Sequence, residues 1–286
     1  MRSHPPTLLT LTRALVREIA LVPRGARVLV AVSGGPDSMA LLHVLARLAD
    51  ELGCAVVAHG VDHGLRAEAA RELDLAADLA RTLGVAFDRT RVALVAGGNL
   101  QARARAARYD ALEAAARVAS CDRIATAHHA DDRAETFLLR LLRGAGPRGL
   151  AVLPPRAEQH GMIRIRPFLR ARRADIEAHV RRHALPFATD PSNANPRFAR
   201  ARVRHELMPL LEQLSPAIVT HLSALADQLE RLDAAQTAQE PSPLPRATRM
   251  ALEVLLAGRA PGAEVRLPGG LVATVRRDQV KAARSR

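Results

Sequence analysis

The sequence predicts an α/β protein in which a doubly wound, mainly parallel sheet is followed by a smaller helical domain. Over the first 150 residues, short apolar runs alternate with segments of helical periodicity, which is the pattern of parallel strands joined by crossover helices. From residue 172 to residue 232, helical segments follow one another without a strand between them. A chain of 286 residues is long enough to bury the cores of both parts.

The expected elements follow in order from the N-terminus. A short amphipathic helix comes first, and the apolar run Val28–Val32 then predicts a buried strand. The sequence S-G-G-P-D-S follows it, and Met39–Leu48 has the apolar character of a buried helix. Further strands are expected at 55–58, 85–95 and 123–127. Further helices are expected from 68 to Gly84, from a cap at Asn99 to about 119, and from 131 to 143.

We expect three parts along the chain, a sheet domain over 1–150, a helical domain over 151–235 and a small C-terminal element over 236–286. The helical domain is predicted to begin with a hairpin around Gly161. The stretch 234–246 is rich in Pro, Gln and Ser and is interpreted as a linker. One further helix and a short strand near 267–275 are expected after it.

The charge balance favours a large polyanionic partner. The 42 Lys and Arg residues against 29 Asp and Glu residues give a net charge of +13, and nucleic acid fits this better than a membrane surface. Lys281 is the only lysine, so the composition also reflects a GC-rich genome, which does not alter the net charge. Only 2% of residues are aromatic, which argues against a protein that reads RNA by base stacking. No apolar run approaches the roughly 20 residues of a membrane helix, so we expect a cytoplasmic protein.

The loop from Ser33 to Ser38 has the features of a phosphate-binding turn. It lies between a buried strand and a helix, so its backbone amides and the helix N-terminus can face an anion, and its glycines allow close approach. A purely structural turn is the alternative. The loop lacks the lysine of a Walker A motif and does not match the dinucleotide-binding pattern either.

A second group of ionisable side chains follows the strand expected at 123–127. The stretch reads A-H-H-A-D-D-R-A-E-T and lies where open α/β sheets bind ligands. Spacing alone leaves a metal site, a solvated helix start and an amino-acid pocket open. Asp132 and Glu135 are three residues apart on one helical face, so they could hold a cation together.

These motifs together resemble a known family. The loop matches the S-G-G-x-D-S signature of the PP-loop, or N-type ATP pyrophosphatase, superfamily. The chain resembles the tRNA(Ile)-lysidine synthetases within it, because that family couples the loop to the H-H and D-D-x-x-E-T motif and to R-G-x-G-x-x-G-L. Further matches are D-H-G-L-R, A-R-Y, R-P-F-L, D-P-S-N and R-x-R-x-R, and the resemblance runs from about Val28 to Leu211.

The resemblance implies a ligase that modifies tRNA, with ATP as co-substrate and Mg²⁺ as cofactor. ATP would be cleaved between its α- and β-phosphates to adenylate C2 of the wobble cytidine in an isoleucine tRNA with a CAU anticodon. Free L-lysine would then displace AMP and give lysidine. The implied catalytic residues are Asp37, His128, Asp132 and Glu135.

The resemblance also implies three sets of binding residues. ATP is expected at Ser33, Gly34, Gly35, Pro36, Asp37, Ser38 and Asp62, with Asp37 also facing Mg²⁺. Lysine is expected at Arg108 through its carboxylate and at Asp132 and Glu135 through its ammonium. Phosphates of tRNA are expected at Arg170, Arg200, Arg202 and Arg204. The structural alternatives are a dipole-stabilised carboxylate at Asp37, a hydrogen bond of the fold at His128 and solvated arginines elsewhere.

Three departures from the family pattern are visible. Arg133 replaces the usual Gln before A-E-T, Ala201 replaces the usual Asn of R-N-x-I-R, and the extra C-terminal domain of longer members is not expected. A tRNA 2-thiolation enzyme of the same superfamily is the nearest rival, but Cys54 and Cys121 form no C-x-x-C motif. A non-catalytic RNA-binding protein is the second rival. The sequence does not determine the oligomeric state and is compatible with a homodimer.

Overall fold

The computed structural model describes residues 6–62, 64, 68–92, 100–188, 199–239, 264–267, 271–276 and 279–284. The chain divides into two compact units, Met1–Glu230 and Arg231–Arg286. Among the helices in these ranges, none is both long and apolar enough to span a membrane.

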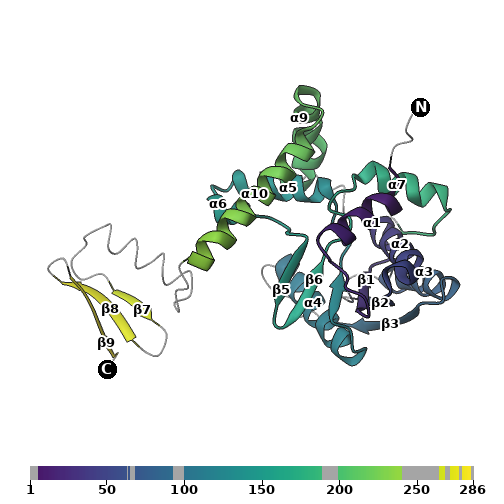
Figure 1. Cartoon of the computed structure of the whole chain (residues 1–286), viewed down its shortest axis with the longest axis horizontal. Helices are drawn as coiled ribbons and strands as arrows, with labels where there is room; N and C mark the ends of the chain where they lie inside the picture. Colours follow the sequence, from purple (N-terminus) through teal and green to yellow (C-terminus); the bar gives the residue numbers. More distant parts are fainter. Residues whose placement is uncertain are drawn as a thin grey trace. The chain divides into compact units, whose positions relative to one another are not determined.

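The first unit is built on a six-stranded sheet (Figure 1). Its strands are β1 Arg27–Val32, β2 Ala55–Asp62, β3 Ala86–Arg91, β4 Arg123–Ala125, β5 Arg156–Gln159 and β6 Met162–Ile165. Their order is β3-β2-β1-β4-β6-β5, and every neighbouring pair is parallel except β5 and β6. The predicted mainly parallel sheet is therefore confirmed.

Helices connect and cover these strands. They are α1 Leu8–Glu18, α2 Pro36–Leu52, α3 Glu68–Thr82, α4 Leu100–Val118, α5 Ala130–Leu141, α6 Pro147–Leu150, α7 Arg173–Arg182, α8 Ala199–Arg202, the π-helical turn η2 Val203–Leu207, α9 Met208–Leu214 and α10 Ile218–Gln239. Helix α2 starts with Pro36 at its first turn, where no amide partner is needed, and ends at Gly53 in the left-handed conformation. It contains the buried helix expected at Met39–Leu48 and extends beyond it at both ends.

Alternate residues of β1 pack on opposite faces of the sheet. Val28, Val30 and Val32 belong to the core beneath α1, α2, α3 and α7, whereas Leu29 belongs to a smaller core with Leu112 of α4. Both faces of the strand are buried, so β1 is an apolar run without polar alternation. The fold is thus doubly wound, as predicted.

The strand order reverses between β1 and β4. Strands β2 and β3 follow β1 in sequence on one side, and the chain then returns through α4 to place β4 on the other side. The loops after β1 and β4 consequently leave the same edge of the sheet in different directions. Open α/β sheets bind their ligands at such a switch point.

Several boundaries differ from those expected. The hairpin around Gly161 is present, but β5 and β6 extend the sheet, and the compact unit continues past residue 151 to Glu230. Helix α10 runs to Gln239 and includes the first residues of the expected linker.

In the second unit, three antiparallel strands, β7 Glu264–Leu267, β8 Leu271–Arg276 and β9 Gln279–Arg284, occupy the region where one strand was expected. The helix expected before them and the cap at Asn99 lie outside the described residues.

Candidate active site

The loop between β1 and α2 requires glycine at one of its two glycine positions. Gly34 has φ +80°, and a Cβ atom added there would lie 2.4 Å from the backbone oxygen of Glu72 in α3. Gly35 has an ordinary backbone conformation, and the nearest atom to an added Cβ is Ser33 Oγ at 3.6 Å. The fold therefore requires Gly34, whereas Gly35 is free to serve a ligand.

Two serines hold the loop in place. Ser38 Oγ donates to the carbonyl of Gly35 at 2.9 Å and accepts from the backbone amide of Ser33 at 3.1 Å. The hydroxyl oxygens of Ser33 and Ser38 are 3.2 Å apart. These bonds close the loop on itself, and no side chain among the described residues caps the N-terminus of α2, so its first amides remain available to an anion.

Asp37 lies in the first turn of α2 with about a third of its side chain exposed. Burial raises the pKa of its carboxyl, and the charge of Asp132 adds to the effect, although His129 and two arginines oppose it. A carboxylate whose charge is disfavoured by its surroundings gains from a nearby cation. This property fits the expected contact with Mg²⁺.

His129 is the residue that connects the loop to the second group of ionisable side chains. Its imidazole is fully buried, with ring nitrogens 3.4 Å from Asp131, 3.4 Å from Asp132 and 4.0 Å from Asp37. Burial opposes protonation, but the contact with Asp131 and the charges of Asp132 and Asp37 outweigh it and raise the pKa of His129. Sequence reasoning selected His128 and missed His129. The only available signal was the pair of adjacent histidines, whose side chains must point in different directions.

His128 faces a different environment from its neighbour. Its Nδ1 shares a hydrogen bond of 3.0 Å with Thr126 Oγ1. Burial and the nearby Arg166, Arg105 and Arg108 lower the pKa of His128 to about 3, despite the opposing charge of Asp132. The imidazole is therefore neutral near pH 7 and can exchange hydrogen bonds without adding charge.

Arg108 lies on α4 near this histidine. Its guanidinium carbon is 5.4 Å from the centre of the Tyr109 ring, and its Nε is buried without a hydrogen-bond partner. Arg166, which is almost fully buried, also has an unpartnered Nε. Unpaired buried donors of this kind favour an incoming anion.

Two of the three carboxylates of α5, Asp132 and Glu135, are paired with Arg200 and Arg204 of the helical part of the chain. Glu135 accepts hydrogen bonds from Arg204 at 2.6 and 2.9 Å and from Arg200 at 2.9 Å. Asp132 accepts from Arg200 at 3.0 Å and from Arg204 at 3.5 Å. Burial by itself would raise the pKa of Asp132, but His129, Arg200 and His128 together lower it. The structure thus brings Asp132 and Glu135 together as expected, but places Arg200 and Arg204 on them.

Asp131 fixes the start of α5. It accepts hydrogen bonds from Arg172 Nε at 3.0 Å, from Arg172 Nη2 at 2.9 Å and from the backbone amide of Arg173 at 2.8 Å. Despite burial, the contacts with His129, Arg172 and Arg173 hold the pKa of Asp131 well below its usual range. Helices α5 and α7 are therefore joined at their N-terminal ends.

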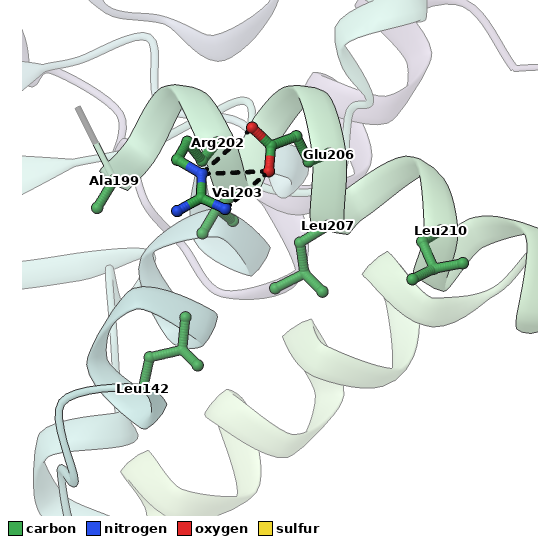
Figure 2. Close-up of a pocket in the computed structure, with 7 residues that line it drawn as sticks. All are labelled: Leu142, Ala199, Arg202, Val203, Glu206, Leu207 and Leu210. Carbon is green, nitrogen blue, oxygen red and sulfur yellow. Dashed lines mark hydrogen bonds and ion pairs between the residues drawn. The ribbon is translucent and has the colours of Figure 1, made fainter. Parts of the chain in front are cut away.

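The remaining expected site residues lie farther from this cluster or are paired elsewhere. Asp62 ends β2, accepts from the amide of Gly64 at 2.8 Å and lies at the same edge of the sheet as the loop. Arg170 forms a two-pronged ion pair with Glu18 of α1. Arg202 pairs with Glu206 at 3.0 Å, as Figure 2 shows. The four arginines expected to bind tRNA are thus all paired with carboxylates in the chain.

This Arg202–Glu206 pair lines a pocket of about 400 Å³, whose lining residues are drawn in Figure 2. Most of its lining is aliphatic, and it is formed by Leu142, Ala199, Arg202, Val203, Glu206, Leu207 and Leu210. Asp132 and Glu135 do not line it, so it is separate from the carboxylate cluster.

Within the described ranges, no group of three or more His, Cys, Asp or Glu side chains is arranged to hold a metal ion. Mg²⁺ commonly binds through one or two carboxylates together with substrate phosphates and does not need such a group. Asp37 beside the loop therefore fits a shared Mg²⁺ site completed by a nucleotide.

Comparison with known proteins agrees with this arrangement. Residues 10–211 match the PP-loop domain family. The chain is 39% identical over 240 residues to a tRNA(Ile)-lysidine synthase of Thermobifida fusca, an alignment that covers 82% of this chain and 73% of that protein. The chain belongs to the tRNA(Ile)-lysidine synthase family. It is also 42% identical over 234 residues to the member from Symbiobacterium thermophilum, covering 79% of this chain and 48% of that protein. It thus spans about half the length of this relative.

A solved structure confirms the fold of this family member. The U34-tRNA thiolase of Methanococcus maripaludis, described with a [4Fe-4S] cluster, superposes with a TM-score of 0.65 at 16% identity. The match covers 78% of this chain and 77% of the thiolase. At this identity the likeness shows a shared fold only.

One departure from the family pattern has a structural explanation here. Arg133 is buried, its Nε donates to the carbonyl of Val152 at 3.0 Å, and its Nη1 lies 2.6 Å from Asp227 of α10. Arg133 therefore ties the helix that carries Asp132 and Glu135 to α10. Ala201 is buried, and nothing in the structure explains why it replaces the usual Asn.

Proposed function

We propose that this protein uses ATP to adenylate C2 of the wobble cytidine in an isoleucine tRNA with a CAU anticodon, and that L-lysine then displaces AMP to give lysidine. One observation carries the proposal. The phosphate-type loop after β1 and the carboxylates after β4 flank the point where the strand order reverses, and His129 lies between them. A nucleotide and a second substrate can therefore meet there.

The loop would bind the phosphates of ATP. The backbone amides of the loop other than that of Ser33, which donates to Ser38, would supply donors at the N-terminus of α2 for the pyrophosphate that leaves, and Gly35 allows close approach. Asp37 would hold Mg²⁺ together with the nucleotide, and the ion would neutralise phosphate charge when bound. Asp62 lies on the neighbouring strand, where it can contact the same ligand.

The second half-reaction would use the residues of α4 and α5. Asp132 and Glu135 offer two carboxylates to the lysine ammonium, while Arg108 offers a cation with an unpaired Nε to the lysine carboxylate. The amine must lose a proton before it attacks, and one of the two carboxylates can accept it. His128 is neutral near pH 7 and can hydrogen-bond the reacting oxygen.

A 2-thiolation activity finds less support. The whole chain contains two cysteines, too few for a cysteine-held cluster and a sulfur relay. Cys121 is buried and Cys54 is half-buried, and burial raises the pKa of both thiols. Neither is a poised thiolate at neutral pH.

Labelled lysine tests the proposal directly. The purified protein is incubated with ATP, radiolabelled L-lysine and total bacterial tRNA, and label is expected in one isoleucine tRNA with release of pyrophosphate. Pyrophosphate release without incorporation of lysine would show a different second substrate. No ATP-dependent change in the tRNA would contradict the whole proposal.

A substitution then tests the role of α5. Glu135→Gln removes one charge at constant shape, so the Michaelis constant for lysine should rise about tenfold to hundredfold, since a hydrogen bond to a charged group contributes roughly 1.5–3 kcal/mol. The constant for ATP should barely change, and adenylated tRNA should still form. Glu212→Gln is the matched control, because Glu212 pairs with Arg172 in the same region without touching Asp132 or Glu135. An effect on ATP alone would assign Glu135 to the nucleotide.

A further inference from the structure

The proposed lysine site already holds cations that belong to the chain. Glu135 is 2% exposed and has three guanidinium groups around it, those of Arg204 at 2.6 Å, Arg200 at 2.9 Å and Arg173 at 3.8 Å. Asp132 shares the first two of these partners. Every strong contact that a lysine ammonium would make with these carboxylates is therefore made by Arg200 and Arg204.

The local charge works against lysine in this arrangement. Arg200 and Arg204 place two positive charges next to the position that an incoming ammonium would occupy. Without them Glu135 would keep only the longer contact with Arg173. At separations of about 3–4 Å in a partly buried site, both charges repel the lysine ammonium.

We propose that Arg200 and Arg204 form a latch that keeps the amino-acid site closed until RNA binds, when phosphates draw both side chains away from Asp132 and Glu135. The latch rests on the proposed function and adds an order of binding to it: RNA first, lysine second. It would keep the site from holding lysine before a substrate is present to receive it.

Three features of the latch suit such an exchange. The side chains of Arg200 and Arg204 are 44% and 26% exposed, so a polyanion can reach them, whereas Glu135 is enclosed. A phosphate can accept the same paired hydrogen bonds from a guanidinium as a carboxylate does. Arg204 also lies in η2, a π-helical turn, and such turns recur at functional sites.

Arg181 provides a matched control outside the residues expected to bind RNA. It is an exposed arginine of α7, and its guanidinium lies 3.8 Å from Glu177, one turn earlier in the same helix. Arg181→Gln removes the same charge as a latch substitution does. It leaves every contact with Asp132 and Glu135 in place.

Equilibrium dialysis with radiolabelled L-lysine tests the latch on the full chain. Lysine binding is measured with a non-hydrolysable ATP analogue present, with and without an unmodified isoleucine tRNA transcript carrying the CAU anticodon. For the unsubstituted protein, the transcript should tighten lysine binding at least about tenfold. The double variant Arg200→Gln, Arg204→Gln should bind lysine without RNA as tightly as the unsubstituted protein does with RNA. Arg181→Gln should keep the full difference between the two conditions.

The outcomes separate the latch from the proposed function. Equal lysine affinity with and without the transcript in the unsubstituted protein would overturn the latch and leave the proposed function standing. Absence of lysine binding in all forms, with transcript and nucleotide present, would overturn both. Because the double variant leaves Glu135 with Arg173 alone, its thermal midpoint is measured as well. If it does not fold, Arg200→Gln is used instead, and unchanged lysine affinity without RNA in that variant would overturn the latch.

Discussion

Replacing Gly34 with alanine should destabilise the protein, whereas the same change at Gly35 should not. Alanine at Gly34 would have to adopt φ +80° and would bring its Cβ to 2.4 Å from the Glu72 oxygen. A left-handed conformation costs roughly 1–2 kcal/mol and overpacking about 1–3 kcal/mol, partly offset by about 0.4–1 kcal/mol from a less flexible unfolded chain. The free energy of unfolding should therefore fall by about 2–4 kcal/mol.

Gly35→Ala is the control, because it makes the same glycine-to-alanine change at the neighbouring position. Its φ is −74°, and the nearest atom to an added Cβ is 3.6 Å away, so alanine fits the fold. Alanine is a poorer N-cap residue than glycine, which costs about 0.5–1 kcal/mol of stability. Alanine also makes the unfolded chain less flexible, which stabilises the fold by a similar amount, so the two effects nearly cancel. Any large effect of Gly35→Ala must then appear in nucleotide binding, because the added methyl group meets an approaching phosphate.

Thermal unfolding followed by circular dichroism and ATP binding by calorimetry measure these effects. For a unit of this size, a loss of about 2–4 kcal/mol lowers the midpoint by roughly 5–15 °C. Gly34→Ala should show this shift, while Gly35→Ala should keep the midpoint and lose affinity for ATP. A midpoint of Gly34→Ala within about 2 °C of the unsubstituted protein would refute the reasoning about the loop.

Three further changes have defined outcomes. Asp37→Asn should leave the free energy of unfolding unchanged or slightly higher, because burial already disfavours the charge. It should also reduce ATP-dependent tRNA modification below about a tenth of the rate of the unsubstituted protein. Activity above that level would remove Asp37 from the mechanism. Arg133→Gln should lower the free energy of unfolding, measured by urea titration, by about 1.5–3 kcal/mol, because its ion pair with Asp227 is lost. An unchanged urea midpoint would mean that the contact between α5 and α10 does not stabilise the fold. Burial lowers the pKa of His43 and of His179 to about 4, so both stay neutral in the fold while the unfolded chain takes up protons below about pH 6.5. Stability should therefore fall as the pH drops from about 6.5 to 4, and fall less in His43→Gln.

The sequence by itself determined the fold class and located two parts of the candidate site, the loop after β1 and the carboxylates of α5. The continuous apolar run Val28–Val32 predicted a strand buried on both faces, and β1 does pack Val30 and Leu29 on opposite sides. The order of strand, S-G-G-P-D-S and helix located the loop, because such local patterns depend on residues close in sequence. The D-D-R-A-E-T stretch likewise placed Asp132 and Glu135 on one helical face, a consequence of helical geometry alone.

The tertiary structure decided what those side chains contact. Periodicity shows that Arg200 and Arg204 share one side of a turn, but not that this side meets α5, about 65 residues earlier in the chain. Only the packed fold shows that Gly34 must be glycine, because the atom that excludes a Cβ belongs to α3. The same holds for one neighbour of His129: Asp131 and Asp132 are close to it in sequence, but Asp37 of α2 reaches it only in the packed fold. Contacts between distant segments arise from packing of whole elements, and local sequence patterns carry little information about them.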